Sequence, residues 1–258
     1  MLKLRVLTAA LLLPAFVAAA FWLPNPWWGA VLFGITMIAA REWARLTGCG
    51  RAVSAVFYGL IVLGCSAGLL ADNWDRWIFG ASIVFWSIAV PLALWRKPPL
   101  RHGVAMTAAG LIVLVPMWLA LLRLQSQPAL MLALLAVVWI SDTAAYGAGH
   151  AFGRHKLAPS ISPGKTWEGV GGAFAAVAVY AAIFHLWWFP AIDLGFVLAS
   201  FFAITALGIL GDLLESLLKR NAGVKDSGTL LPGHGGLLDR VDALTAAMPL
   251  AALLFGRS

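Results

Sequence analysis

Long apolar segments alternate with short polar ones along almost the whole chain. Several of them lack the polar face that a helix at the surface of a soluble protein carries, and an apolar run of about twenty residues can span a bilayer as a helix. The pattern predicts nine spans, at residues 1–23, 27–40, 53–70, 77–94, 104–122, 130–140 continuing towards 149, 169–188, 194–218 and 241–255. We therefore expect an all-α, polytopic membrane protein.

The composition supports this class. Of the 258 residues, 62% are hydrophobic and only 11% are charged, which argues against a soluble domain. The net charge of +7 could suggest nucleic acid, but basic residues in short loops between spans more simply orient a membrane protein. We expect no nucleic-acid partner. Cys49 and Cys65 lie in or beside predicted spans, so we expect no disulfide framework.

The distribution of cations predicts the orientation. With a cytoplasmic N-terminus, 15 of the 18 Lys and Arg residues fall in inner segments, and only Arg76, Arg123 and Arg257 lie outside. An excess of positive charge in cytoplasmic loops is the usual pattern. We expect a multi-pass protein of the cell's inner (plasma) membrane with about nine transmembrane helices and an external C-terminus. The short span 27–40 must cross to preserve this tally, so we extend it through residues 41–43.

Acidic residues are concentrated in the second half of the chain. Eight of the 11 Asp and Glu residues lie between Asp142 and Asp242, and the first half has no dense polar motif. We expect residues 1–128 to form N-terminal scaffold helices. Residues 129–258 are then the catalytic membrane region with its cytoplasmic loops, within one continuous membrane domain.

The first polar motif, residues 142–146, follows the apolar run 130–140. A carboxylate inside a span costs roughly 2.5–3.5 kcal/mol at mid-bilayer and less near the interface. Asp142 therefore needs a partner, which could be a metal, a lysine or a network of donors. A solvated helix end is the alternative interpretation.

The second polar motif covers residues 157–169. Pro163 and Gly164 interrupt the chain, and Thr166 can then cap a helix whose first turn includes Glu168. A lysine beside a helix start, here Lys165, is a familiar way to build an anion site. An ordinary capped loop explains this stretch equally well.

The third polar motif begins within the predicted span 194–218. Four polar residues share one helical face at spacing i, i+3, i+4 and i+7: Asp212, Glu215, Ser216 and Lys219. Asp239 and Asp242 repeat the i, i+3 spacing at the last span. Oxygen ligands without Cys or clustered His favour Mg²⁺ over zinc, and the interleaved cations suit a polyphosphate. Internal ion pairing is the alternative.

Residues 216–242 closely resemble the signature of phosphatidate cytidylyltransferases, also called CDP-diacylglycerol synthases. The resemblance lies in Ser216-Leu-Leu-Lys219-Arg220, Lys225-Asp226, His234-Gly235-Gly236 and Asp239-Arg240-Val241-Asp242. Residues 142–146 and 162–169 also look like family motifs. Good resemblance thus covers about 142–242, with one departure at His150, where Arg or Lys is expected.

The resemblance implies an integral membrane nucleotidyltransferase of phospholipid biosynthesis. Such an enzyme converts CTP and phosphatidic acid into CDP-diacylglycerol and pyrophosphate by metal-assisted attack of the lipid phosphate on the α-phosphate of CTP. Its cofactor would be Mg²⁺, with room for a second ion, and its active site would face the cytoplasm. The alternatives are another CTP-dependent lipid or polyprenol kinase and an ion-coupled secondary transporter.

The resemblance also implies roles for individual residues. The metal ligands would be Asp212, Asp239, Glu215 and Asp142. The catalytic residues would be Asp212, Asp239, Lys219, Lys225 and Arg240. Substrate binding would fall to Ser162, Lys165, Thr166, Ser216, Arg220, His234, Gly235 and Gly236, although a lone histidine such as His234 is more often a hydrogen-bonding loop residue. A homodimer is an option, because the small residues 108–110 can pack between protomers.

Overall fold

A computed structural model describes residues 2–70, 74–100, 103–188, 190, 192–230 and 235–256. Within them, α4 (Asp75–Val84), the π-helical turn η2 (Phe85–Ala89) and α5 (Val90–Arg96) follow one another without a break. The other helices are α1 (Leu2–Trp22), α2 (Asn25–Leu46), α3 (Arg51–Leu70), α6 (Gly103–Leu124), α7 (Pro128–Phe152), α8 (Trp167–Trp188), α9 (Leu194–Ala222) and α10 (Leu238–Phe255). Counting α4–η2–α5 as one rod, the described residues form nine rods, and each overlaps one predicted span.

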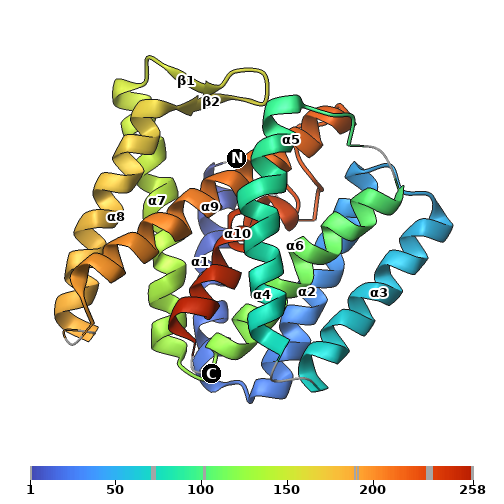
Figure 1. The fold of residues 1–258 in the computed structure, drawn as a ribbon, viewed down its shortest axis with the longest axis horizontal. Coiled ribbons are helices and arrows are strands. Elements are labelled where there is room, and N and C mark those ends of the chain that lie inside the picture. Colours follow the sequence, from blue (N-terminus) through green and yellow to red (C-terminus); the bar gives the residue numbers. More distant parts are fainter. Residues whose placement is uncertain are drawn as a thin grey trace.

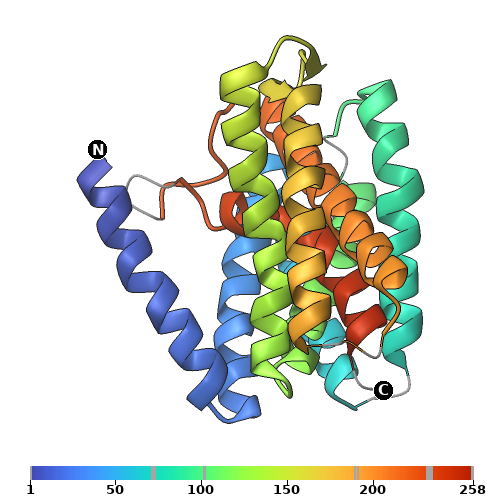
Figure 2. The same ribbon diagram turned by 90° about the vertical axis from the view of Figure 1, so that its left-hand side faces the viewer.

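Successive rods run in alternating directions between the two ends of the molecule (Figures 1 and 2). Six are long and apolar enough to cross a membrane: α3, the α4–α5 rod, α6, α7, α8 and α9. Large apolar side chains on their outer faces, such as Val62, Ile88 and Val179, are exposed. These features support an all-α, multi-pass membrane protein. Figure 2 shows α1 leaning away from the other helices towards its N-terminal end.

Helix α2 is held against α6 by indole hydrogen bonds. Trp28 and Trp43 of α2 donate their Nε1–H groups to carbonyls of α6 at 3.1 and 2.9 Å. Trp118 of α6 donates to a carbonyl of α2 at 3.1 Å. The helix predicted at residues 27–40 continues past residue 43 to Leu46, although α2 is not one of the six helices that are long and apolar enough to cross a membrane.

Gly110 of α6 is packed closely against α2 and α3 within the chain. A Cβ atom there would be 2.7 Å from Cζ of Phe57 and 2.8 Å from Nε1 of Trp43. We expect Gly110→Ala to lower the free energy of unfolding by about 1–3 kcal/mol, because the added methyl group overpacks a rigid contact. Thermal denaturation in detergent measures the change. Gly34→Ala on α2 is the control, since nothing lies within 4 Å of its Cβ position; equal melting temperatures for the two variants would contradict the expectation.

A short antiparallel hairpin joins α7 to α8 and covers one end of the bundle (Figure 1). Its strands are β1 (Lys156–Ala158) and β2 (Ser162–Thr166), which the sequence pattern did not predict. The predicted cap is confirmed: Thr166 Oγ1 accepts a hydrogen bond from the N–H of Gly169 at 3.1 Å, and Glu168 lies in the first turn of α8. The hairpin therefore has a fixed junction with α8.

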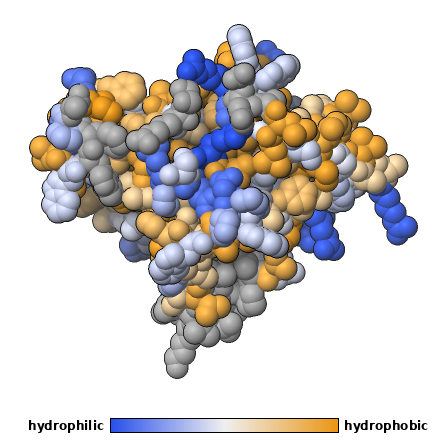
Figure 3. Space-filling view, turned by 90° about the horizontal axis from the view of Figure 1, so that it is seen from below, coloured by the Kyte–Doolittle hydropathy of each residue, from blue (hydrophilic) through white to orange (hydrophobic). Residues whose placement is uncertain are grey.

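The opposite end of the molecule has its own polar group. Arg123 at the end of α6 pairs with Asp75 at the start of α4, at 2.8 Å, and also donates to the carbonyl of Gly68 at 3.0 Å. Seen from this end, hydrophilic side chains gather near the middle of the face, and much of the surrounding surface is hydrophobic (Figure 3). Arg123, one of the three cations expected outside, thus has an acidic partner.

Candidate functional site

A cavity of about 810 Å³ opens between α7, the hairpin, α9 and the start of α10. Twelve of the residues that the sequence singled out line it: Asp142, Ser162, Lys165, Thr166, Asp212, Glu215, Ser216, Lys219, Arg220, Lys225, Asp239 and Arg240. Asp242 lines it too. Polar residues from three separate motifs therefore share one cavity at the hairpin end of an apolar bundle.

Lys165 connects the hairpin to α9. Its ammonium group lies 2.5 Å from Oδ2 of Asp212, and both side chains are partly exposed to the cavity. Ser216, one turn further along α9, has its hydroxyl 3.5 Å from the other oxygen of Asp212. The arrangement places a cation from β2 directly over the first acid of the α9 face.

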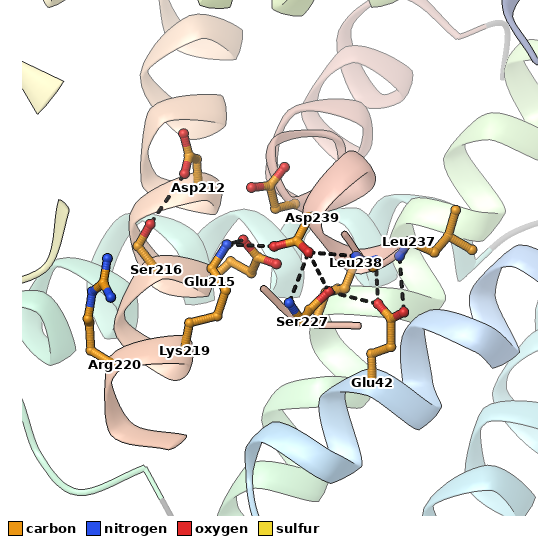
Figure 4. A network of polar contacts seen from close by, with 12 residues as sticks. Glu42, Asp212, Glu215, Ser216, Lys219, Arg220, Ser227, Leu237, Leu238 and Asp239 are labelled. Carbon is orange, nitrogen blue, oxygen red and sulfur yellow. Dashed lines mark hydrogen bonds and ion pairs between the residues drawn. The ribbon is translucent and has the colours of Figure 1, made fainter. Parts of the chain in front are cut away.

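Lys219 connects α9 to α10. Its ammonium group donates to Glu215 at 2.5 Å and to Asp239 at 2.6 Å, so one cation bridges acids from two helices (Figure 4). The Glu215 and Asp239 side chains are only 4% and 7% exposed. Because unpaired charges are costly in such surroundings, the shared ammonium group stabilises the two acids.

The second oxygen of Asp239 is held from the backbone. Oδ2 accepts hydrogen bonds from the N–H groups of Ser227 and Gly236 at 2.9 and 2.8 Å and from the Ser227 hydroxyl at 2.9 Å. Asp239 lies at the start of α10, outside the six apolar spans. Burial alone would raise the pKa of this carboxyl, but hydrogen bonds from its neighbours lower it to about 2. Asp239 is therefore a fixed anion.

Glu42 of α2 reaches the same group from behind. Its carboxylate accepts hydrogen bonds from the N–H groups of Leu237 and Leu238 at 3.1 and 2.7 Å and from the Ser227 hydroxyl at 2.9 Å. Sequence reasoning missed this residue, because Glu42 has no polar motif around it and its partners lie far along the chain. The signal was the acid itself, since a carboxylate beside an apolar span requires a partner.

Some predicted residues do not line the cavity. Gly235 and Gly236 lie beside Asp239, and a Cβ atom at Gly235 would be 2.8 Å from its Oδ2 atom. Gly235 has a φ of 83°, which an L-residue with a side chain rarely adopts. Thr166 does line the cavity, but its hydroxyl is used as a helix cap and the residue is only 4% exposed. His234 lies outside the described residues.

The carboxylate oxygens of the cavity are the type of ligand that a hard cation such as Mg²⁺ prefers. Six carboxylates line the cavity, and among the residues that the structure describes Oε1 of the buried Glu215 has no hydrogen-bond partner, although such an atom ordinarily has one. Among the residues that the structure describes, however, no three acidic, histidine or cysteine side chains are grouped closely enough to hold a metal ion. Lys165 and Lys219 occupy the acids instead, so the geometry is that of a lysine-paired site.

The similarity of this chain to known proteins extends beyond the three polar motifs. Residues 3–256 match the cytidylyltransferase family. The phosphatidate cytidylyltransferase of Pseudomonas aeruginosa is 37% identical, over 98% of this chain and 97% of that protein. Those of Haemophilus influenzae and Brucella suis are 32% and 37% identical, over 99% and 98% of this chain and 99% and 92% of theirs. The similarity thus includes the helices before residue 142, and the chain belongs to the cytidylyltransferase family.

Proposed function

We propose that this protein is a phosphatidate cytidylyltransferase, which converts CTP and phosphatidic acid into CDP-diacylglycerol and pyrophosphate. The observation that carries the proposal is the family match over the same residues that line the polar cavity. Relatives similar along nearly their whole length bear the name of this activity. A cavity with both acids and bases at one end of an apolar bundle is a suitable place for a lipid phosphate to meet a nucleotide.

The reaction depends more on the alignment of the two substrates than on proton transfer by the protein. An oxygen of the lipid phosphate attacks the α-phosphorus of CTP, the bond from that phosphorus to the bridging oxygen breaks, and pyrophosphate leaves with the electron pair. A phosphate monoester has a second pKa of about 6 and is largely ionised at neutral pH, so no protein base is required. The protein must align the reactants and neutralise the phosphates.

The cations of the cavity are suited to that task. Lys219, Arg220, Lys225 and Arg240 would hold the triphosphate and the departing pyrophosphate, and Lys165 with Ser162 would hold a phosphate at the hairpin. Lys165 and Lys219 are now paired with carboxylates. When phosphates enter, these ammonium groups can exchange a carboxylate partner for a phosphate oxygen, and the released carboxylates would then need another cation.

The acids of the cavity are the proposed ligands of Mg²⁺. Asp212 and Asp239 would hold Mg²⁺, with Glu215 and Asp142 beside them and the unpartnered oxygen of Glu215 as an available donor. One or two such ions, when bound, would neutralise charge on the phosphate oxygens. The protein's own contribution is to keep the acids ionised and fixed, as the contacts of Asp239 do.

The proposed location is the inner membrane with the cavity facing the cytoplasm. The hairpin, the C-terminal part of α9 and the start of α10 line one cavity, and these segments carry cations that the sequence tally assigns to the cytoplasmic side. Positive charge favours the cytoplasmic side, where CTP is available. The N-terminus would then also be cytoplasmic, and phosphatidic acid would reach the cavity sideways from the inner leaflet with its acyl chains still in the bilayer.

The products decide between this activity and its alternatives. Purified protein incubated with labelled CTP, phosphatidic acid and Mg²⁺ is expected to yield CDP-diacylglycerol and pyrophosphate in equal amounts. A lipid or polyprenol kinase would release CDP, and an ion-coupled transporter would give flux in liposomes without nucleotide. Either result, in the absence of a liponucleotide product, would refute the proposal.

A further inference from the structure

Glu42 belongs to α2, but its carboxylate forms hydrogen bonds with residues outside that helix. It lies in α2, is 8% exposed, and directs its carboxylate away from α2 to the start of α10. A buried carboxylate is destabilising unless its oxygens receive hydrogen bonds. Glu42 receives three, and every donor belongs to the loop before α10 or to its first residues.

The first role of these hydrogen bonds is to complete the N-terminus of α10. The first N–H groups of any helix lack partners within it, and the residue before α10, Leu237, supplies no side-chain cap. Glu42 accepts from Leu237 and Leu238 in its place, and a negative charge there also suits the helix dipole. The position of the first turn of α10, which carries Asp239, is thus set by a residue nearly 200 positions away in the sequence.

The second role runs through Ser227. The hydroxyl oxygen lies 2.9 Å from Oε2 of Glu42 and 2.9 Å from Oδ2 of Asp239. A hydroxyl has one hydrogen, so the two carboxylates share it. Arg45, one turn beyond Glu42 on α2, donates to the carbonyl of Ser227 at 2.6 Å and fixes the same residue from its other side. Figure 4 shows Asp239 between Lys219 and this group.

Two glycines pack closely against the Glu42 carboxylate. A methyl group on Gly228 would collide with its Oε1 atom, and one on Gly236 would lie 2.5 Å from Oε2 and collide with the Ser227 hydroxyl. Gly228 and Gly236, two glycines of residues 216–242, therefore leave space for the Glu42 side chain. Their presence is explained by this carboxylate, without any contact to a substrate.

We infer that Glu42 is a positioning residue for Asp239: it fixes the first turn of α10 directly and the Asp239 carboxylate through the Ser227 hydroxyl. The inference rests on the proposed function, in which Asp239 acts in the cavity. Glu42 lies behind Asp239 and does not line the cavity, so its replacement should change turnover and leave substrate binding nearly intact.

The test compares Glu42→Gln and Ser227→Ala with the wild type in detergent, measuring kcat, KM for CTP, and melting temperature. Glutamine keeps the size of the side chain but replaces one acceptor by an N–H₂ group that faces other donors. We expect kcat to fall by roughly 10- to 100-fold for Glu42→Gln, as for other residues that orient a ligating group. Ser227→Ala, which removes only the shared hydroxyl, should lower kcat by about 10-fold. KM for CTP should stay within about threefold in both.

The controls separate positioning from stability. Asp193→Asn changes an exposed acid that caps the far end of α9 and does not line the cavity, so it should keep kcat within about twofold. The double variant Glu42→Gln with Ser227→Ala should lose little more than Glu42→Gln alone, because both changes cut one link. Wild-type kcat in Ser227→Ala, or losses that multiply in the double variant, would overturn the inference. Asp239→Asn is the reference: if it stays active, the role of Asp239 fails, whereas if it alone is inactive, only the inference about Glu42 fails.

Discussion

Asp239→Asn is expected to fold and to lose activity by about 10²-fold or more. Asparagine has the shape of aspartate, so the turn around Gly236 can form, but the negative charge that faces Lys219 disappears. The magnitude corresponds to the loss of one preorganised electrostatic contact in an active site. Liponucleotide formation at saturating CTP, phosphatidic acid and Mg²⁺ measures it. Asp212→Asn should behave in the same way, since this carboxylate holds Lys165 on the other side of the cavity.

A matched control lies at the far end of α9. Asp193 is exposed and caps that helix by accepting a hydrogen bond from the N–H of Phe196 at 2.9 Å. Asparagine caps helices equally well, so Asp193→Asn should retain activity within about twofold. Near wild-type turnover of both Asp239→Asn and Asp212→Asn would remove the two acids from the mechanism.

Lys219→Met is expected to lower stability even without substrate. The change leaves Glu215 and Asp239, at 4% and 7% exposure, without the cation that they share. Removing one partner of a buried ion pair costs about 3–5 kcal/mol, and the lower value applies because Lys219 is itself 15% exposed. For a chain of this size the melting temperature should fall by roughly 6–12 °C. Thermal denaturation in detergent without nucleotide or Mg²⁺ gives the comparison.

Lys97→Met is the companion variant for that measurement. Lys97 is exposed and, among the described residues, donates a hydrogen bond to the Ser160 hydroxyl alone, at 2.6 Å, so its removal should change stability by less than about 0.5 kcal/mol. Equal melting temperatures for the two lysine variants would mean that Glu215 and Asp239 do not depend on Lys219 for their charge.

The helices could be predicted from the sequence because a bilayer restricts the possibilities. Inside it, backbone groups must be satisfied within the segment, so apolar length alone indicates a helix and its approximate ends. The charged motifs were likewise recognisable, since Asp212, Glu215 and Lys219 are close in sequence and share a face. Their common cavity with Lys165 and Asp142 follows from the resemblance to a known family, without which the three motifs could not have been placed together.

The hairpin and Glu42 could not be predicted in this way. Strands β1 and β2 have three and five residues and include Pro163 and Gly164, so no alternation of apolar and polar positions marks them. Glu42 depends on partners that only the folded chain brings near, and Arg45, three positions further along α2, likewise binds Ser227 from the distant loop. In both cases the deciding interactions are long-range, and a local pattern contains no information about them.

Two glycines of α8, Gly169 and Gly172, allow this helix to pack very closely against α7. A Cβ atom on Gly169 would be 2.7 Å from the carbonyl oxygen of Ala145, and one on Gly172 would collide with the Ala148 methyl group. The two helices therefore touch backbone to backbone, and the hairpin is mounted on their shared end. High salt should screen the attraction between Lys165 and Asp212, yet it leaves that mounting untouched, so the hairpin stays over the cavity when the ion pair is weakened.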